Sequence, residues 1–114
     1  MGKTGVLGAF EEMVLLAVLH QGDEAFGVSI RRELHERSGS DIAVGAVYAT
    51  LDRLEAKGLV KSRTGERRVS RRGRPRRYYD IQPAGIEELG RTRSVRHRMW
   101  DGIELPVTAS RGDP

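Results

Sequence analysis

The segment with the clearest chemical potential is residues 71–80, RRGRPRRYYD, in which five arginines surround a glycine and a proline and two tyrosines follow. Guanidinium groups suit the geometry of phosphate oxygens and keep their charge at any physiological pH. From Arg53 to Tyr79 the chain holds eleven Lys or Arg and two acids, a net charge of +9, whereas the remainder carries −5. A basic segment on an acidic body attracts a polyanion, so a phosphate-rich partner is favoured over a merely solvated loop.

Residue patterns typical of catalysis or metal binding are missing from the sequence. The chain has no cysteine, which excludes disulfides, thiolate nucleophiles and Cys-ligated zinc and suits a reducing cytoplasm. His20, His35 and His97 are scattered, and no HxxxH pattern, Gly-rich phosphate loop or nucleophile motif accompanies them. The sequence therefore predicts a protein that is not an enzyme and that holds neither a metal nor a cofactor.

The length and the hydrophobic runs predict one small intracellular domain. The 114 residues match the size of one ordinary domain. The longest apolar run, residues 13–19, reaches only about 10 Å as a helix, far less than a bilayer requires. The first ten residues lack the pattern of a secretion signal. We expect a cytoplasmic, nucleoid-associated protein with no membrane contact.

Three helices are predicted before the basic segment, at residues 8–20, 25–37 and 44–57. Gly39 and Gly58 follow the second and third helices, where glycine accepts the left-handed conformation of a helix end. The first helix is apolar on nearly all sides. Such a helix is buried on nearly all sides, so it is either a central core helix or a helix that also packs against a partner subunit.

The third predicted helix has a core face and a face with little side chain. Val47, Leu51 and Leu54 are spaced to face the core. Gly45 and Ala46 lie in the first turn, and their small side chains allow another surface to approach the backbone closely.

Residues 59–66 and 76–83 are the predicted strands of a β-hairpin. The arginines then form the exposed tip of the hairpin, and the tyrosines belong to the returning strand. Alternation of period two places Tyr79 and Ile81 on the inner face and Tyr78 on the other face. We expect the Tyr78 ring to lie along the hairpin with its hydroxyl free to reach a phosphate.

A final helix is predicted from Pro83, a favoured first helical residue, to about Ile103. It is long for so small a core, and Trp100 lies near its far end, where a large apolar ring usually buries against another surface. We therefore predict a C-terminal dimerisation helix over residues 83–105, after a domain of residues 8–82 and between flexible termini at 1–7 and 106–114. The predicted dimer interface is Phe10, Met13, Leu16, Leu89, Val95, Met99, Trp100 and Ile103.

Three helices, a hairpin and a final helix form a mainly α protein with a small β-hairpin, in the order of a winged helix-turn-helix domain. In that geometry the third helix enters the major groove of double-stranded DNA and the hairpin contacts the neighbouring backbone or minor groove. Base reading falls to the exposed positions of the third helix, where Thr50 and Arg53 carry useful donors. The predicted DNA contacts are Gly45, Ala46, Tyr48, Ala49, Thr50, Arg53, Lys57, Arg72, Arg74, Arg76, Arg77 and Tyr78.

Two other interpretations stay open on the residues alone. One is a small α+β domain with a solubilising loop. The other is a winged-helix protein-interaction module that docks its basic hairpin on an acidic partner.

Three segments, GAVYATLDRLEAKGLV, GRPRRYYDI and PAGIEEL, together resemble the PadR family of bacterial transcriptional regulators. The resemblance implies a repressor that binds a palindromic operator as a homodimer through its C-terminal helix. Tyr48 matches the tyrosine of the family's recognition helix, and Gly73, Pro75, Tyr78 and Tyr79 match its wing.

The chain departs from the family pattern at a few positions. Ala43 stands where the family usually has Ser or Thr, Val44 where it often has Pro, and Gln82 where it commonly has Thr. Residues 26–28, Phe-Gly-Val, replace a His-Gly-Tyr. With one short C-terminal helix there is little room for a family ligand pocket. A small-molecule effector is possible but unsupported.

Overall fold

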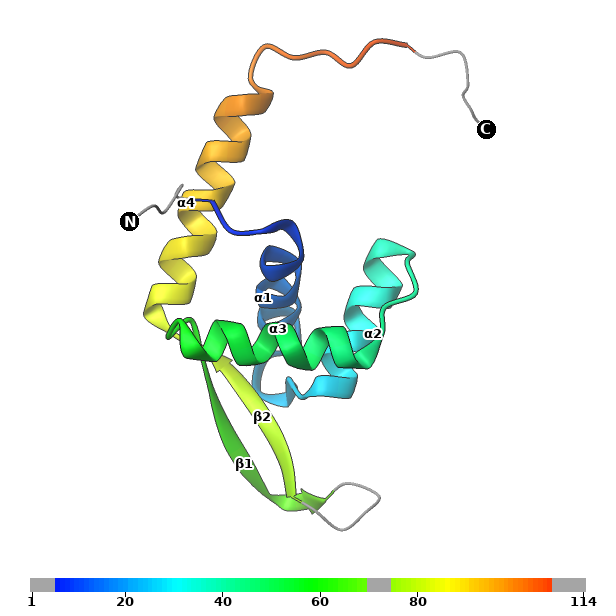
Figure 1. Ribbon diagram of the computed structural model, residues 1–114, viewed down its shortest axis with the longest axis vertical. Helices are drawn as coiled ribbons and strands as arrows, with labels where there is room; N and C mark the ends of the chain where they lie inside the picture. The colour runs from blue at the N-terminus through cyan, green and yellow to red at the C-terminus, as the bar shows by residue number, and fades with distance from the viewer. Residues whose placement is uncertain (1–5, 70–74, 108–114) are drawn as a thin grey trace.

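The computed structural model describes the backbone of residues 6–69 and 75–107, and it has the predicted mainly helical architecture with a two-stranded antiparallel hairpin (Figure 1). The elements are α1 (Ala9–Gln21), the 3-10 turn η1 (Gly22–Glu24), α2 (Gly27–Ser38), α3 (Val44–Ala56), β1 (Val60–Val69), β2 (Pro75–Ile81) and α4 (Pro83–Trp100). The predicted order is confirmed, and most bounds agree within one or two residues.

Helix α1 is the centre of the core, with α2, α3 and β2 packed around it. Val14, Leu15 and Val18 are buried, which requires neighbours on more than one side of the helix. Leu16 and Leu19 remain more than 40% exposed, so α1 also keeps an uncovered apolar side. Both expectations for this helix, a core role and a second surface, are therefore compatible with its burial.

The connection between α2 and α3 depends on one glycine and one arginine. Gly39 has a φ of 72° and its N–H donates to the His35 carbonyl, which ends α2. Arg31 then braces the following loop, donating to the Ile42 carbonyl at 2.7 Å and to the Asp41 carboxylate at 3.2 Å. Helix α3 itself has no side-chain cap, because the residue before it, Ala43, has no side-chain oxygen.

The hairpin pairs Val60 with Ile81 and Ser62 with Tyr79, and its strands extend farther toward the tip than the sequence predicted. Tyr79 is 1% exposed and lies in the core, as predicted, and Ile81 packs partly against the core. The Tyr79 N–H donates to the Ala25 carbonyl at 2.9 Å, so the base of the hairpin is joined to the segment that precedes α2.

Helix α4 begins at Pro83, as predicted, but ends at Trp100, three residues before the predicted end. It joins the domain through Gly85, Leu89 and Thr92, which are buried. The N–H of Leu7 donates to the Thr92 hydroxyl at 2.9 Å and Leu7 is buried, so the prediction of a flexible terminus over residues 1–7 is wrong at this position. Arg96, one turn farther along, still pairs with Glu12 of α1 at 2.8 Å, and the end of the helix leads away from the other elements (Figure 1). Within the described ranges, no helix is both long and apolar enough to span a bilayer.

Candidate nucleic-acid interface

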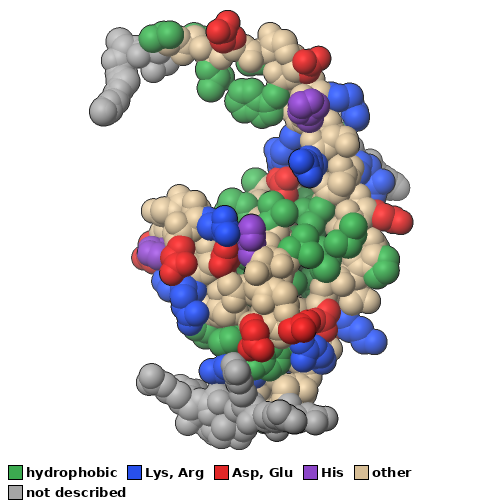
Figure 2. Space-filling model, turned by 180° about the vertical axis from the view of Figure 1, so that it is seen from behind, with side chains coloured by type: hydrophobic (Ala, Val, Ile, Leu, Met, Phe, Trp, Pro, Cys, Tyr) green, Lys and Arg blue, Asp and Glu red, His purple; other side chains and the backbone are tan. Residues whose placement is uncertain are grey.

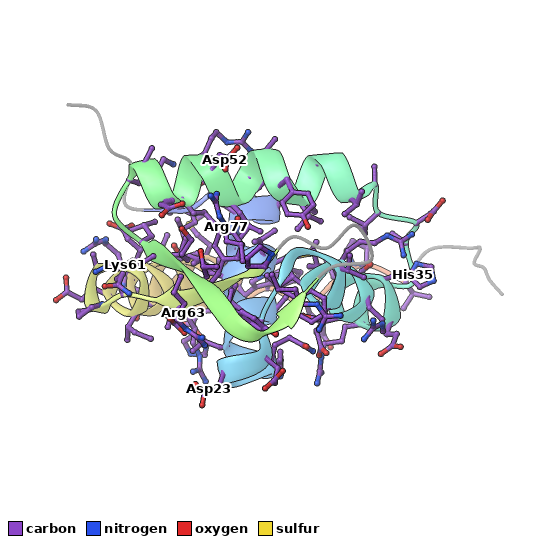
Figure 3. All side chains as sticks on the ribbon, turned by 90° about the horizontal axis from the view of Figure 1, so that it is seen from below. Asp23, His35, Asp52, Lys61, Arg63 and Arg77 are labelled. Carbon is purple, nitrogen blue, oxygen red and sulfur yellow. The ribbon has the colours of Figure 1, made fainter. Side chains whose placement is uncertain are left out.

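Helix α3 and the hairpin lie on one side of the molecule, with Arg77 of β2 between the hairpin and α3 and Asp52 on the helix (Figure 3). The first turns of α3 are exposed at Gly45, Ala46 and Ala49, as predicted. These positions carry no side chain beyond a methyl group, so a partner can approach the helix backbone closely.

Tyr48 is the largest side chain on this exposed part of α3, and its ring lies against Gly27 at the start of α2. The ring is 42% exposed. A Cβ atom at Gly27 would lie 2.2 Å from both Cζ and Oη of Tyr48, so only glycine leaves room for the ring there. Helix α2 thus sets the direction in which the α3 tyrosine points.

Thr50 does not lie on the exposed side of α3. It is 1% exposed, and its hydroxyl accepts a hydrogen bond from Arg53 Nη2 at 3.0 Å. The prediction of Thr50 as a base-reading residue is therefore wrong. Helical spacing places residue 50 beside the core positions 47, 51 and 54, and the hydroxyl is used internally to hold Arg53.

Arg53 and Lys57 are exposed, as predicted, but both are paired with a carboxylate from α1. Glu11 Oε2 lies 3.7 Å from Arg53 Nε and 3.0 Å from Lys57 Nζ. Lys57 also donates to Glu11 Oε1 at 3.1 Å. The two cations of the α3 end therefore share one counter-ion in the free protein.

Tyr78 anchors the hairpin rather than extending from it. It is 5% exposed, and its ring meets Phe26 edge-on at a centroid distance of 5.7 Å and an interplanar angle of 67°. Gly65 of β1 makes room for the ring, since a Cβ there would lie 2.5 Å from Tyr78 Cε1. The expectation of a tyrosine hydroxyl free to reach a phosphate is corrected: Tyr78 fixes the hairpin to the start of α2.

Two arginines of the hairpin stack on this aromatic pair. The guanidinium carbon of Arg63 lies 5.1 Å from the Tyr78 ring centroid, and that of Arg76 lies 4.1 Å from the Phe26 centroid. Such cation–π contacts hold the arginines along the hairpin while leaving their charge in place. Arg63 also forms an ion pair with Asp80 at 2.8 Å, which raises the pKa of the guanidinium further above its usual value.

Arg77 is exposed and lies next to the Tyr79 phenol. Burial raises the pKa of Tyr79, and Arg77 opposes this through a hydrogen bond and its charge. The predicted contacts Arg72 and Arg74 fall outside the residues that the structure describes. Arg76 and Arg77 are thus the predicted wing arginines whose placement is known.

The predicted dimer residues divide into two groups. Met99, Trp100 and Ile103 are 73%, 56% and 58% exposed and, with Leu105, line an open hollow of about 240 Å³ at the far end of α4. Hydrophobic side chains gather there and, separately, on the body of the molecule (Figure 2). Leu16 is also exposed, and Val95 is partly so.

The other group faces the domain's own core. Leu89 is buried in it, so its assignment to a dimer interface is corrected, and Phe10 and Met13 are half-buried against it. Helical spacing alone could not separate these positions, because α4 packs on the domain through its earlier turns and not at its end.

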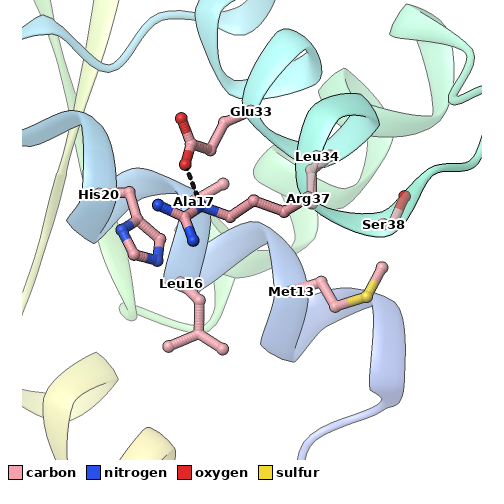
Figure 4. A pocket seen from close by; sticks show the side chains of 8 residues that line it. All are labelled: Met13, Leu16, Ala17, His20, Glu33, Leu34, Arg37 and Ser38. Carbon is pink, nitrogen blue, oxygen red and sulfur yellow. Dashed lines mark hydrogen bonds and ion pairs between the residues drawn. The ribbon is translucent and has the colours of Figure 1, made fainter.

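A second hollow, of about 180 Å³, lies between α1 and α2 (Figure 4). Its floor is apolar, formed by Met13, Leu16, Ala17 and Leu34, and His20 and Ser38 complete the lining. Glu33 and Arg37 form an ion pair at its edge, and the hydrogen bond from Arg37 is the main reason that the pKa of Glu33 is lowered. No group of three or more His, Cys, Asp or Glu that could hold a metal occurs in the described part of the chain.

Sequence reasoning missed three residues that shape this interface: Glu11, Phe26 and Gly27. Phe26 falls inside the helix predicted at residues 25–37, but it is the residue before α2, where it contacts the hairpin. No local pattern connects Glu11 with Lys57, which is 46 positions away. For Gly27 the resemblance did offer a signal, the glycine of the Phe-Gly-Val segment.

Comparison with known proteins gives consistent results. The family model of the transcriptional regulator PadR-like family matches residues 15–91. The transcriptional regulator Rv3488 of Mycobacterium tuberculosis is 42% identical over 88 residues, which cover 75% of this chain and 78% of that protein.

Solved structures agree with this match. The structure of a PadR family transcriptional regulator from Eggerthella lenta is similar to this one, with a TM-score of 0.63 and 30% sequence identity. The alignment covers 79% of this chain and 76% of the Eggerthella lenta chain. A transcriptional regulator from Clostridium thermocellum has the same fold, with a TM-score of 0.66 and 24% sequence identity. That alignment covers 79% of this chain and 84% of the Clostridium thermocellum chain.

Proposed function

This chain belongs to the PadR-like family of transcriptional regulators, and we propose that it represses transcription by binding a palindromic operator in duplex DNA as a homodimer. The single observation that carries the proposal is the shared face of α3 and the hairpin, where an exposed helix of small residues lies beside exposed arginines. A family of transcriptional regulators is not a class of enzymes, and we propose no catalytic activity.

The placement of the side chains suggests different roles for α3 and the hairpin in DNA binding. Helix α3 enters the major groove with Gly45, Ala46 and Ala49 against the base edges and Tyr48 directed by α2. Arg76 and Arg77 contact phosphates or the minor groove, and we extend the same role to Arg72 and Arg74. Phosphate contacts of this kind add affinity and salt dependence rather than sequence choice.

The exposed end of α4 supports the homodimer. Met99, Trp100 and Ile103 form an apolar surface that a monomer would leave in water, and large exposed apolar patches mark interaction sites. A two-fold dimer would place the two α3 helices one DNA turn apart, about 34–36 Å. We propose that Leu16 and Val95 extend this interface and that the protein acts on the nucleoid in the cytoplasm.

One experiment tests operator binding directly. The purified protein selects duplexes from a random library, and the bound pool is read for an enriched two-fold symmetric motif. The proposal expects a palindrome whose half-sites are about one helical turn apart. Enrichment of no motif, with equal binding to every duplex at moderate salt, would instead favour the interaction module that docks its hairpin on an acidic protein.

A further inference from the structure

Glu11 places a carboxylate of α1 against the only two cations at the α3 end, Arg53 and Lys57, within the described part of the chain. Its side chain is 13% exposed, whereas Arg53 and Lys57 are 56% and 48% exposed. The carboxylate is thus covered by its partners, while the cations remain open to solvent. A phosphate can reach both cations without any rearrangement of the core.

The contacts are directional and shared. Lys57 Nζ donates to both Glu11 oxygens, at 3.1 and 3.0 Å. Arg53 is held on two sides, with Nη2 donating to Thr50 Oγ1 at 3.0 Å and Nε lying 3.7 Å from Glu11 Oε2. One negative charge therefore offsets half of the positive charge that α3 could present to DNA.

We propose that Glu11 is a specificity-determining residue of the DNA-binding surface: an internal counter-ion that suppresses sequence-independent binding. This rests on the proposed binding of duplex DNA. Sequence-independent affinity comes from cations that neutralise phosphates, so a cation already neutralised contributes less to it. Base contacts depend on position and are affected far less by Glu11. Glu11 thereby leaves α3 to read the sequence while the hairpin supplies most of the charge.

The neighbouring residue provides a matched control. Glu12 lies in the same turn of α1 and forms an ion pair of 2.8 Å with Arg96 of α4, away from α3 and the hairpin. Its side chain is 18% exposed, close to that of Glu11. Glu11→Gln and Glu12→Gln raise the net charge equally, so they differ only in which cations they release.

The test measures the affinity of each full-length variant for a random-sequence duplex across a salt series. Glu11→Gln removes one negative charge, so it should steepen the slope of log K against log salt by about 0.9, the value for one additional neutralised phosphate. Between about 50 and 200 mM salt, a slope change of ~0.9 corresponds to an additional ~3.5-fold loss of affinity. Glu12→Gln should keep the slope of the unaltered protein.

A second measurement uses the operator recovered by selection. Glu11→Gln should lower the ratio of operator affinity to random-duplex affinity, because the random-duplex affinity rises more. If Glu11→Gln does not fold, Glu11→Asp is measured in its place. Its shorter side chain withdraws the carboxylate from Lys57 without changing the net charge, so the slope of log K against log salt should still steepen.

The outcomes separate this inference from the proposed function. If the unaltered protein selects a palindrome but Glu11→Gln leaves slope and ratio unchanged, the inference is overturned. Equal steepening by Glu11→Gln and Glu12→Gln would also overturn it, because net charge alone would explain the effect. If the unaltered protein binds no duplex, the proposed function itself fails.

Discussion

Gly27→Ala places a methyl group in the space that the Tyr48 ring occupies. The new Cβ would lie 2.2 Å from Cζ and Oη and 2.5 Å from Cε1 of Tyr48. Nonbonded carbon atoms rest about 3.5–4.0 Å apart, so the ring edge must retreat by more than ~1 Å. These atoms are the far end of a flexible side chain that is 42% exposed, and the ring can therefore swing toward solvent.

The movement of the Tyr48 ring should change the stability of the protein less than its affinity for DNA. The ring loses its packing on α2, but alanine is favoured over glycine in a helix by about 0.5–1 kcal/mol, so the free energy of unfolding should change by less than ~1 kcal/mol. DNA binding should suffer more, because the proposed contact of Tyr48 with DNA requires the ring to keep the direction that Gly27 gives it. A hydrogen bond to a charged group is worth about 1.5–3 kcal/mol, which is about tenfold or more in affinity.

Denaturant unfolding gives the stability change, and fluorescence anisotropy with a labelled duplex gives the affinity. The same substitution in a Tyr48→Ala background is the control, since without the ring the methyl group should have no further effect on binding. The reasoning is refuted if Gly27→Ala weakens binding equally in both backgrounds, or if it leaves the affinity of the otherwise unaltered protein unchanged. A loss of stability above ~3 kcal/mol would show that the ring cannot move aside.

Three other predictions concern the fold, the dimer and one phenol. Gly85→Ala should lower the free energy of unfolding by about 1–3 kcal/mol, because its Cβ would lie 2.4 Å from the backbone oxygen of Leu59, which cannot swing away; denaturant titration measures this. Trp100→Ala should shift the size-exclusion peak toward the monomer, and an unchanged dimer would place the interface elsewhere. Burial raises the pKa of Tyr79, so the unfolded chain releases this proton first and stability should fall as pH rises above about 10, as thermal unfolding at several alkaline pH values would show. A Tyr79→Phe variant that keeps the full alkaline loss would contradict this assignment.

Much of the architecture was predictable because its signals are local. The spacing of Val47, Leu51 and Leu54 identified the core face of α3, and all three are buried. Gly39 marked the end of α2 through the positive φ that the structure shows. Alternation of period two placed Tyr79 inward, and it is among the most buried side chains.

The same local rules failed where an outside neighbour determines burial. Tyr78 lies on the outer face of an isolated hairpin, yet Phe26 covers it. Leu89 shares the apolar character of Trp100, but Leu89 rests on the domain whereas Trp100 lies at the end of α4, which extends away from it. Periodicity describes which residues share a face of an element and contains no information about what covers that face.

By itself, the sequence determined the order of the helices and strands, the concentration of positive charge in the hairpin and the small side chains of the first turns of α3. Each of these features follows from residues close together in the chain. Only the tertiary structure decided that Gly27 directs Tyr48, that Phe26 anchors Tyr78 and that Glu11 neutralises part of the α3 charge. These contacts join residues far apart in sequence, and they exist because packing around α1 brings the starts of α1 and α2 against α3 and the hairpin.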